Sequence, residues 1–348
     1  MNAVADAPRP ELTTVADDQV VVHTGESVRV YDGLEPDTVV QIDGVSGVDG
    51  PRVRTLPRPG ELLARIATVN DVHFGETEAG KIDGVDEWPT YSVPPGGEPY
   101  PEFMSAGAVA EMSAVSPDLV VVKGDLTAEG TEAEYERFLQ VYGDAFGERL
   151  LHVRGNHESF NGLDRADWPM QERQLPGVTV ALLDTSRNER INGELSSDQL
   201  DWLDELGARA DRPVMVFGHH PVSNPAEEPR HDHNFGLIPD STEALAAVFE
   251  RRPSMVGYFA GHTHRNRVVH LPDAGGRPFV EVASVKEYPG SWAEYRIFDG
   301  GILQVHRRIS TPAALAWSEQ TRNMYGGLYH DYAFGTLEER CFALQVPA

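Results

Sequence analysis

Seven apolar runs of strand length constrain the fold of this chain more than any other feature. They alternate with segments of helical period, a pattern typical of domains built from layers of helices and sheets. Most of the runs are too apolar to lie at a surface, so they indicate buried strands. The predicted strands are residues 64–69, 119–123, 150–154, 178–183, 214–217, 256–260 and 279–283.

Three predicted helices begin at sequences that resemble a capping box, in which a short polar residue is followed three positions later by Glu or Gln. These starts are Thr131 with Glu134, Ser196 with Gln199 and Asp240 with Glu243. Each of them precedes an apolar-periodic run. Strands and helices together predict an α/β fold, arranged as an α+β structure of four layers, with a central sandwich of two mixed β-sheets flanked by helices.

The two ends of the chain differ from this central part. Residues 1–17 are rich in Ala, Pro and Asp and lack periodicity, which predicts a mobile tail. Residues 18–60 alternate short β-branched runs with turn signals, which predicts a small N-terminal β module. We expect the main domain over residues 61–310 and a C-terminal extension over residues 311–348. The aromatic residues of that extension indicate packing or subunit contact, so a homodimer stays open as an assembly.

Charge and cysteine content exclude several classes of partner and site. The 29 Lys and Arg against 55 Asp and Glu give a formal charge of −26, which disfavours nucleic acid and anionic membranes as partners. A single cysteine, Cys341, excludes an internal disulfide and a cysteine cage, so metal ligands must be nitrogen or oxygen atoms. The chain shows neither a basic start followed by an apolar run nor eighteen consecutive apolar residues, and we therefore expect a cytoplasmic protein.

Five short polar motifs each follow directly on one of the apolar runs. They are Asp71-Val72-His73, Gly124-Asp125, Gly155-Asn156-His157-Glu158, Gly218-His219-His220-Pro221 and Gly261-His262-Thr263-His264. Because such folds assemble sites at the carboxyl ends of strands, we expect the motifs to converge. Carboxylates, an amide and neutral imidazoles suit a pair of divalent ions that hydrolyse a phosphate ester. Each motif alone recurs by chance, but the ordered set favours a functional site.

In this order the motifs resemble those of the calcineurin-like metallophosphoesterase superfamily, over about residues 64–285. Within it the chain is most similar to the bacterial class III cyclic nucleotide phosphodiesterases, through the two motifs around His219 and His262 and through the stretch from Leu183 to Leu203. Ala128 stands where purple acid phosphatases have a metal-binding Tyr, and the Gly-Asp motif lacks the Arg that protein phosphatases use. The resemblance makes residues 61–310 the catalytic domain.

A binuclear centre is the main implication of the resemblance. Asp71, His73 and His264 would bind one ion, and Asn156, His219 and His262 the other, with Asp125 bridging them. The family favours an Fe/Mn or Mn/Mn pair, whereas Zn, Co and Ni are also compatible with nitrogen and oxygen ligands.

Catalytic roles follow from the same resemblance. His157 would assist the departing alkoxide as a general acid, and Asn156 would help to hold the phosphoryl oxygens. Glu158 is expected to orient His157, and His220 to support His219 or line the pocket. Four basic residues that flank the motifs are further candidates for phosphate binding: Lys123, Arg154, Arg265 and Arg267. Strand alternation turns some of them away from the site, but the sequence does not show which. The segment His231-Asp232-His233 is interpreted as solvated loop.

The expected function is hydrolysis of a small phosphate ester, with 3′,5′-cyclic nucleotides such as cAMP as the leading substrates. We expect a hydroxide held by the two ions to attack phosphorus in line. Phosphomonoesters, 2′,3′-cyclic nucleotides and other diesters such as glycerophosphodiesters are the alternatives. Two rival classes are a nuclease, which the acidic composition disfavours, and a non-catalytic metal-binding scaffold, which would normally lack some of the ligands.

Overall fold

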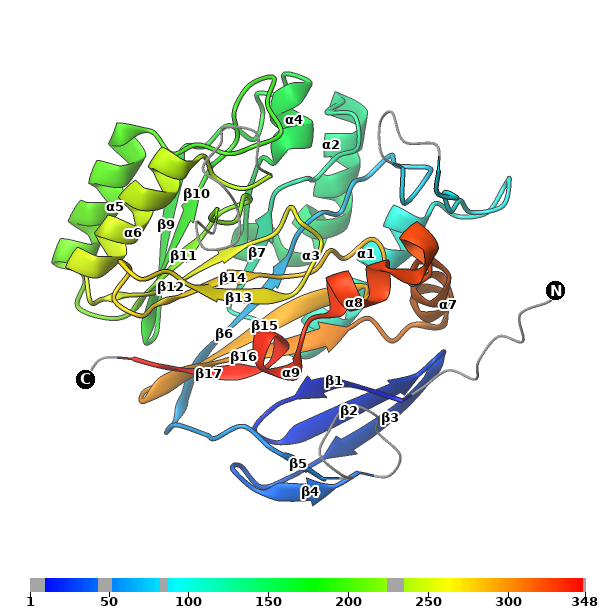
Figure 1. The fold of residues 1–348 in the computed structure, drawn as a ribbon, viewed down its shortest axis with the longest axis horizontal. Coiled ribbons are helices and arrows are strands. Elements are labelled where there is room, and N and C mark those ends of the chain that lie inside the picture. Colours follow the sequence, from blue (N-terminus) through cyan, green and yellow to red (C-terminus); the bar gives the residue numbers. More distant parts are fainter. Residues whose placement is uncertain (1–9, 43–51, 82–86, 224–234, 347–348) are drawn as a thin grey trace.

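The fold is built around two mixed six-stranded sheets that face each other (Figure 1). It is described by a computed structural model for residues 10–42, 52–81, 87–223 and 235–346. The first sheet contains, in spatial order, β17 (Phe342–Gln345), β16 (Gly301–Arg308), β15 (Ser291–Phe298), β6 (Leu62–Val69), β7 (Leu119–Lys123) and β8 (Leu150–Val153). The second contains β13 (Arg267–His270), β14 (Pro278–Glu281), β12 (Met255–Ala260), β11 (Val214–Phe217), β10 (Val178–Leu183) and β9 (Met170–Leu175).

Helices cover the outer face of each sheet, which completes the expected four layers (Figure 1). The first sheet carries α1 (Tyr100–Ala114), α2 (Glu132–Phe138) and α7 (Pro312–Thr321), and the second carries α5 (Ser197–Arg209) and α6 (Pro239–Arg251). Shorter helical elements are η1 (Leu139–Gly143), α3 (Asp144–Phe146), η2 (Gly147–Arg149), α4 (Asn156–Phe160), η3 (Met324–Gly327), α8 (Tyr329–Phe334) and α9 (Leu337–Arg340).

Alternate side chains of each central strand face opposite sides of the sheet, one side toward the other sheet and one toward the helices. In β7, Val121 faces the space between the sheets, whereas Val120 and Val122 pack under the helices of the first layer. Successive side chains of a strand point to opposite faces, so a strand that is covered on both sides must be apolar throughout. All five residues of β7 are accordingly buried. This is why continuous apolar runs predicted the central strands.

Each of the seven predicted strands is present, with ends that differ by at most a few residues. The starts of α2 and α5 are also confirmed, because Thr131 and Ser196 form the expected capping boxes. The expected start at Asp240 is wrong in detail. Ile238 precedes the helix, Pro239 occupies its first position, and Asp240 lies inside the first turn. A proline at this position is pre-set for a helix and needs no side-chain cap.

The N-terminal module contains a three-stranded antiparallel sheet of β1 (Glu11–Val15), β2 (Gln19–Thr24) and β3 (Ser27–Asp32), together with the pair β4 (Val39–Gln41) and β5 (Arg52–Arg54). The prediction of a mobile tail over residues 1–17 is wrong for β1, which is buried along its length. Its Thr14 hydroxyl donates to the His306 carbonyl at 2.7 Å, so the strand is held by distant parts of the chain. Residues 1–9 lie outside the described part.

The segment expected as a C-terminal extension is joined closely to the main domain. Its strand β17 pairs with β16 and forms one edge of the first sheet. Its helix α8 lies close to the start of β13, as the bond from the backbone N–H of Asn266 to the Ala333 carbonyl shows. Among the helices of the described residues, none is both long and apolar enough to cross a membrane.

Candidate metal centre

The five motifs meet at one edge of the sandwich, as predicted. Asp71 follows β6, Asp125 follows β7 and Asn156 follows β8, three neighbouring parallel strands of the first sheet. His219 follows β11 and His262 follows β12, which are parallel neighbours in the second sheet. The site is therefore assembled from the carboxyl ends of strands in both sheets.

One cluster consists of Asp71, His73 and His264, whose candidate ligand atoms all lie within 4.8 Å of one another. Nε2 of His264 is 3.6 Å from Oδ1 of Asp71. The imidazole rings of His73 and His264 meet edge to face, with centroids 5.6 Å apart. The three residues predicted to share an ion are thus brought together.

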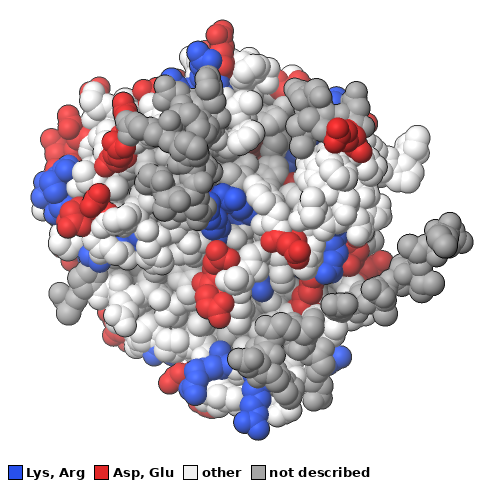
Figure 2. Space-filling view, viewed as in Figure 1, with Lys and Arg blue, Asp and Glu red and all other residues white. Residues whose placement is uncertain are grey.

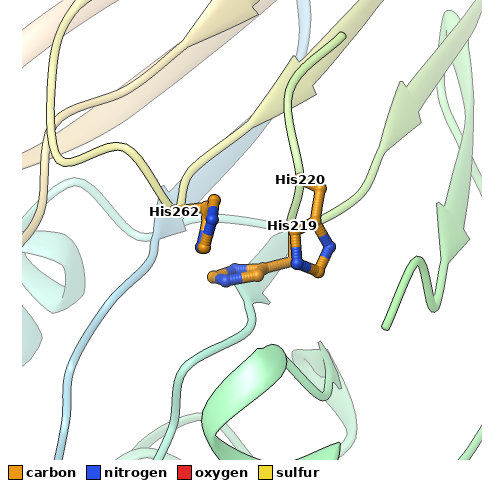
Figure 3. Close-up of side chains that lie close together, drawn as sticks. All are labelled: His219, His220 and His262. Atoms are coloured by element: carbon orange, nitrogen blue, oxygen red, sulfur yellow. The ribbon is translucent and has the colours of Figure 1, made fainter. Parts of the chain in front are cut away.

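A second cluster forms around His219 and His262. Their ring centroids are 4.9 Å apart, and Figure 3 shows both imidazoles gathered with that of His220 at the ends of their strands. The amide oxygen of Asn156 lies 3.1 Å from Nε2 of His219. The structure therefore also brings together the predicted ligands of the other ion.

Asp125 lies between the two clusters. Its Oδ2 atom is 3.5 Å from Nε2 of His73 and 3.2 Å from Nε2 of His219. Gly155 allows this approach, because a Cβ atom built there would lie 2.1 Å from Oδ1 of Asp125. One carboxylate thus faces the ligands of both clusters, which is the position expected for a bridging group.

Unpaired ring nitrogens test whether these residues fit metal ions. Both nitrogens of His73 and both of His262 are buried without a hydrogen-bond partner, although buried polar atoms are normally paired. Burial lowers the pKa of His73 to about 4 and that of His262 to about 3. Both imidazoles are therefore neutral near pH 7 and present lone pairs, as metal ligands must. The donor set fits divalent ions.

Charge within the site is compensated between acids and imidazoles. Burial alone would lower the pKa of His219, but the Asp125 carboxylate outweighs it and raises the pKa to about 9. Burial would also lower the pKa of His264, but Asp71 and Glu287 outweigh it and raise the pKa to about 10. Bound cations would take the place of these protons, because metal ligation requires deprotonated imidazole.

The backbone of the site is held in an uncommon conformation. Five of the seven predicted ligands have positive φ: Asp71 (56°), His73 (48°), Asp125 (49°), His262 (68°) and His264 (55°). For residues with a Cβ atom this left-handed region costs on the order of 1 kcal/mol each. Such strain persists where the surrounding structure fixes it, and it is typical of functional sites.

His157 lies beside the first cluster and is oriented by the backbone. Its Nδ1 is 2.7 Å from the Ala128 carbonyl, to which it donates, and its own N–H donates to Oδ1 of Asp125 at 3.1 Å. The ring meets that of His73 edge to face at 4.4 Å. With Nδ1 engaged, Nε2 is the nitrogen left for other contacts.

The expectation that Glu158 orients His157 is wrong. One oxygen of its buried carboxylate accepts from the N–H and hydroxyl of Thr127, at 2.7 and 2.6 Å, and the other accepts from the Gly155 N–H at 2.7 Å. Glu158 therefore ties the turn before α4 to the loop that carries Asp125. The Ala128 carbonyl orients His157 in place of the Glu158 carboxylate. The two side chains are consecutive in α4 and point to different sides of the helix.

His220 has both ring nitrogens engaged in the second sheet. Nδ1 lies 2.8 Å from the Thr185 hydroxyl and Nε2 lies 2.9 Å from the Ile191 carbonyl. A carbonyl can only accept, so Nε2 carries the proton and Nδ1 accepts from Thr185. The ring packs against that of His262, with centroids 4.6 Å apart. His220 lines the site and buttresses the second cluster.

The four basic candidates for phosphate binding all have partners in the described structure. Lys123 is buried and donates to the Ala260 carbonyl at 2.7 Å. Arg154 forms a buried ion pair with Asp184 at 2.9 Å. The remaining pair share one carboxylate, with Arg265 at 2.7 Å and Arg267 at 3.5 Å from Glu281. The segment His231-Asp232-His233 lies outside the described residues.

Sequence reasoning missed several residues that support the candidate ligands. The Glu287 carboxylate accepts from Nδ1 of His264 at 2.6 Å, and the Asn70 amide donates to Asp71. Thr185 positions His220. Asn70 could have been found, because it is the first polar residue after a predicted strand. Glu287 stands in no motif, and only the fold reveals its partner.

Comparison with known proteins agrees with this geometry. A family model described as calcineurin-like phosphoesterase matches residues 64–266. A 3′,5′-cyclic-nucleotide phosphodiesterase of Nostoc sp. is 27% identical over 59% of this chain and 73% of its own length. A glycerophosphodiester phosphodiesterase of Enterobacter lignolyticus is 29% identical over 46% of this chain and 61% of its own.

Two further matches define the extent of the similarity. A probable cyclic nucleotide phosphodiesterase of Synechococcus sp. is 31% identical over 34% of this chain, which spans about half (48%) of that relative's length. Among solved structures, a dimetal phosphatase from Danio rerio superimposes with a TM-score of 0.55 at 18% identity, covering 72% of this chain and 98% of that one. At this identity the superposition supports the fold.

Proposed function

This chain belongs to the calcineurin-like phosphoesterase family, and we propose that it hydrolyses small phosphodiesters with two bound divalent ions. The observation that carries the proposal is the position of Asp125, whose Oδ2 lies within 3.5 Å of a ring nitrogen from each cluster. When bound, such a pair of ions activates water at neutral pH and neutralises charge on the phosphoryl oxygens.

The ligands divide as the resemblance implies. Asp71, His73 and His264 would hold one ion, and Asn156, His219 and His262 the other, with Asp125 shared. Imidazole and carboxylate ligands are compatible with Mn, Fe, Zn, Co and Ni, and the family resemblance favours an Fe/Mn or Mn/Mn pair.

His157 is the proposed general acid. The Ala128 carbonyl fixes Nδ1 as a donor, which leaves Nε2 to give a proton to the departing alkoxide oxygen. A histidine can hold and release a proton near neutral pH, which the role requires. The side-chain amide of Asn156 is proposed to orient the phosphoryl group as well as to bind metal.

Apart from the two ions, the charges of the described side chains favour a diester over a monoester. A phosphate monoester carries a charge of about −1.5 to −2 at pH 7, whereas a diester carries a single negative charge. Among the described residues, six basic side chains around the site already have carboxylate or carbonyl partners: Lys123, Arg154, Arg187, Arg265, Arg267 and Lys286. A second substrate charge would therefore find little compensation from these side chains.

Names of the relatives point to the same class, because cyclic nucleotides and glycerophosphodiesters are both diesters. We propose a cyclic nucleotide such as 3′,5′-cAMP as the leading substrate. Phosphomonoesters and 2′,3′-cyclic nucleotides are the alternatives. On the face drawn in Figure 2, acidic and basic side chains are interspersed, whereas nucleic-acid surfaces gather Lys and Arg in one patch.

The first experiment compares bis(p-nitrophenyl) phosphate with p-nitrophenyl phosphate, using purified protein and added Mn²⁺. We expect kcat/KM for the diester to be higher by roughly tenfold, which corresponds to about 1.4 kcal/mol. Asp125→Asn serves as the inactive control. A preference for the monoester would overturn the assignment to diesters.

A second panel ranks 3′,5′-cyclic nucleotides, 2′,3′-cyclic nucleotides and glycerophosphodiesters by kcat/KM under the same conditions. The leading class should be the 3′,5′-cyclic nucleotides. Mn²⁺ binding without hydrolysis of any ester would instead identify a metal-binding scaffold, a reading that the full set of seven ligands disfavours.

A further inference from the structure

The C-terminal segment reaches a metal ligand through two hydrogen bonds that share one oxygen atom. Oε1 of Glu287 accepts from Nδ1 of His264 at 2.6 Å and from the Tyr329 hydroxyl at 2.5 Å. Glu287 is 3% exposed and Tyr329 is 4% exposed. Because both groups are withdrawn from water, losing either bond would leave a buried polar atom unpaired.

These bonds fix which nitrogen of His264 can bind metal. The Nδ1–H is donated to a carboxylate, so Nε2, which lies 3.6 Å from Oδ1 of Asp71, is the nitrogen that would give up its proton to bind metal. A carboxylate in this position sets the tautomer and ring orientation of a ligating histidine. The Tyr329 hydroxyl in turn holds the carboxylate, and so it is connected to the ligand through one intermediate.

Other contacts hold the same segment against the loop that carries His262 and His264. The Tyr332 hydroxyl donates to the Thr263 carbonyl at 2.8 Å, and the Asn266 amide donates to the Phe334 carbonyl at 3.2 Å. The segment then turns at Gly335, where a Cβ atom would lie 2.4 Å from the Asn266 carbonyl oxygen. The aromatic segment therefore follows the metal-binding loop closely over several residues.

We propose that Tyr329 is a positioning residue of the metal centre, which acts on His264 through Glu287. This inference rests on the proposed function to the extent that it requires the metal site. It gives the aromatic C-terminal segment a role in metal binding in addition to the packing expected from its sequence.

Tyr329→Phe isolates the hydroxyl from the rest of the side chain. The ring would keep its contacts with Tyr325 and Tyr332, at centroid distances of 5.7 and 6.0 Å. If Tyr329 had only a structural role, Tyr329→Phe would then change metal affinity little. A positioning residue would lose metal affinity, because Glu287 would be less firmly held against His264.

The experiment measures Mn²⁺ bound per chain against free Mn²⁺ by equilibrium dialysis. Loss of a group that orients a ligand typically weakens metal binding by about 10- to 100-fold. We expect Glu287→Gln to weaken Mn²⁺ binding at one of the two ions by a factor within that range. For Tyr329→Phe we expect a loss of affinity at its lower end, about tenfold. Tyr325→Phe is the matched control, since among the described contacts its hydroxyl has no hydrogen bond, and it should bind as the wild type does.

The double variant shows whether Tyr329 acts through Glu287. In the Glu287→Gln background, Tyr329→Phe should change Mn²⁺ affinity by less than about twofold, because residues that act as one unit are not additive. Equal affinity of Tyr329→Phe and Tyr325→Phe would overturn the inference, as would wild-type affinity in Glu287→Gln. Absence of Mn²⁺ binding in the wild type would instead overturn the proposed function.

Discussion

At the scale of single residues, the site combines imidazoles that burial keeps neutral with carboxylates that neighbouring charges keep ionised. The pKa values of His73 and His262 are lowered by burial. That of Asp125 is also lowered, because His219 and His157 outweigh the opposing effect of burial. Lone pairs and negative charge are thus both available near pH 7, and each protonation state follows from a contact in the fold.

His157 provides the sharpest test at this scale. His157→Ala should lower kcat for the diester by about 10²- to 10⁴-fold, the usual contribution of a general acid. Mn²⁺ content after dialysis should stay close to that of the wild type, because the bond to Asp125 comes from the backbone N–H. Steady-state kinetics and metal analysis on the same sample provide the two measurements.

The matched control is His270→Ala, which removes an exposed imidazole at the end of β13. It should leave both activity and metal content unchanged. If His157→Ala lost metal in proportion to activity, His157 would be a ligand and the role proposed for it would be wrong.

Residues of the site differ in how far the sequence could predict them. The predicted ligands directly follow apolar strands, so position and residue type together pointed to them. Glu287 and Tyr329 were not found, because their role depends on packing between distant segments rather than on any local pattern. Glu158 was found but given the wrong partner, since His157 and Glu158 are consecutive in α4 and their side chains point to different sides of the helix.

At the scale of elements, β15 and β16 escaped prediction because they carry polar residues inside the fold. β15 carries Glu294 and Arg296, yet all eight of its residues are buried. Glu294 is bound by Arg296 at 2.9 Å and also by Arg307 from β16. Because paired charges can be buried where isolated ones cannot, the strand lacks the apolar pattern of its neighbours. The polar edge strand β9 was missed for a related reason.

The turn between β8 and α4 yields a prediction of its own. Gly155→Ala would place a Cβ atom 2.1 Å from Oδ1 of Asp125, so the loop that carries Asp125 must move. We expect Mn²⁺ binding to weaken at both ions and stability to fall by about 1–3 kcal/mol, as for other overpacked sites. Dialysis and urea unfolding measure the two effects.

Gly143→Ala is the control for that variant. In this helical segment the nearest atom to the added Cβ is 3.8 Å away, and φ is −65°, so an alanine fits without strain. It should leave metal binding and stability close to those of the wild type. Normal Mn²⁺ binding by Gly155→Ala would show that the centre does not depend on this close approach.

At the scale of the whole molecule, one buried carboxylate links the N-terminal module to the rest of the chain. Glu11 of β1 is 3.1 Å from Arg308, 2.6 Å from Arg322 and 2.7 Å from His330. It also accepts from the Tyr288 hydroxyl at 3.1 Å. The module is therefore joined to β16, to the residue that follows α7 and to α8, which explains why β1 is ordered although its sequence resembles a tail.

Replacing this carboxylate tests the connection. Glu11→Gln should lower the free energy of unfolding at pH 7 by about 3 kcal/mol, because removing one partner leaves buried charges unpaired. Burial would raise the pKa of Glu11, but the bond from His330 and the charges of Arg308 and Arg322 outweigh it, so the pKa lies below the ordinary 4.5.

The pH dependence gives this prediction its sign. Because the pKa of Glu11 is lower in the folded protein than in the unfolded chain, the ionised carboxylate stabilises the fold. This contribution is fully present above the unfolded pKa of about 4.5, and it is lost as the pH falls through the pKa of the folded state. The difference in the free energy of unfolding between wild type and Glu11→Gln, measured by urea unfolding, should therefore become smaller below pH 4.5. Glu26→Gln, at the exposed turn between β2 and β3, should match the wild type throughout. A gap that widened on acidification would contradict this account.

The bond between Tyr329 and Glu287 also has a consequence for biosynthesis. All seven candidate ligands lie between residues 71 and 264, so a growing polypeptide presents them before the ribosome has made the residues that steady His264. Such a nascent chain could capture ions only loosely, and it would retain them firmly once the aromatic segment had emerged and docked. Maturation of the centre would thus be coupled to the late steps of translation, when the cell has already committed to synthesis of the chain.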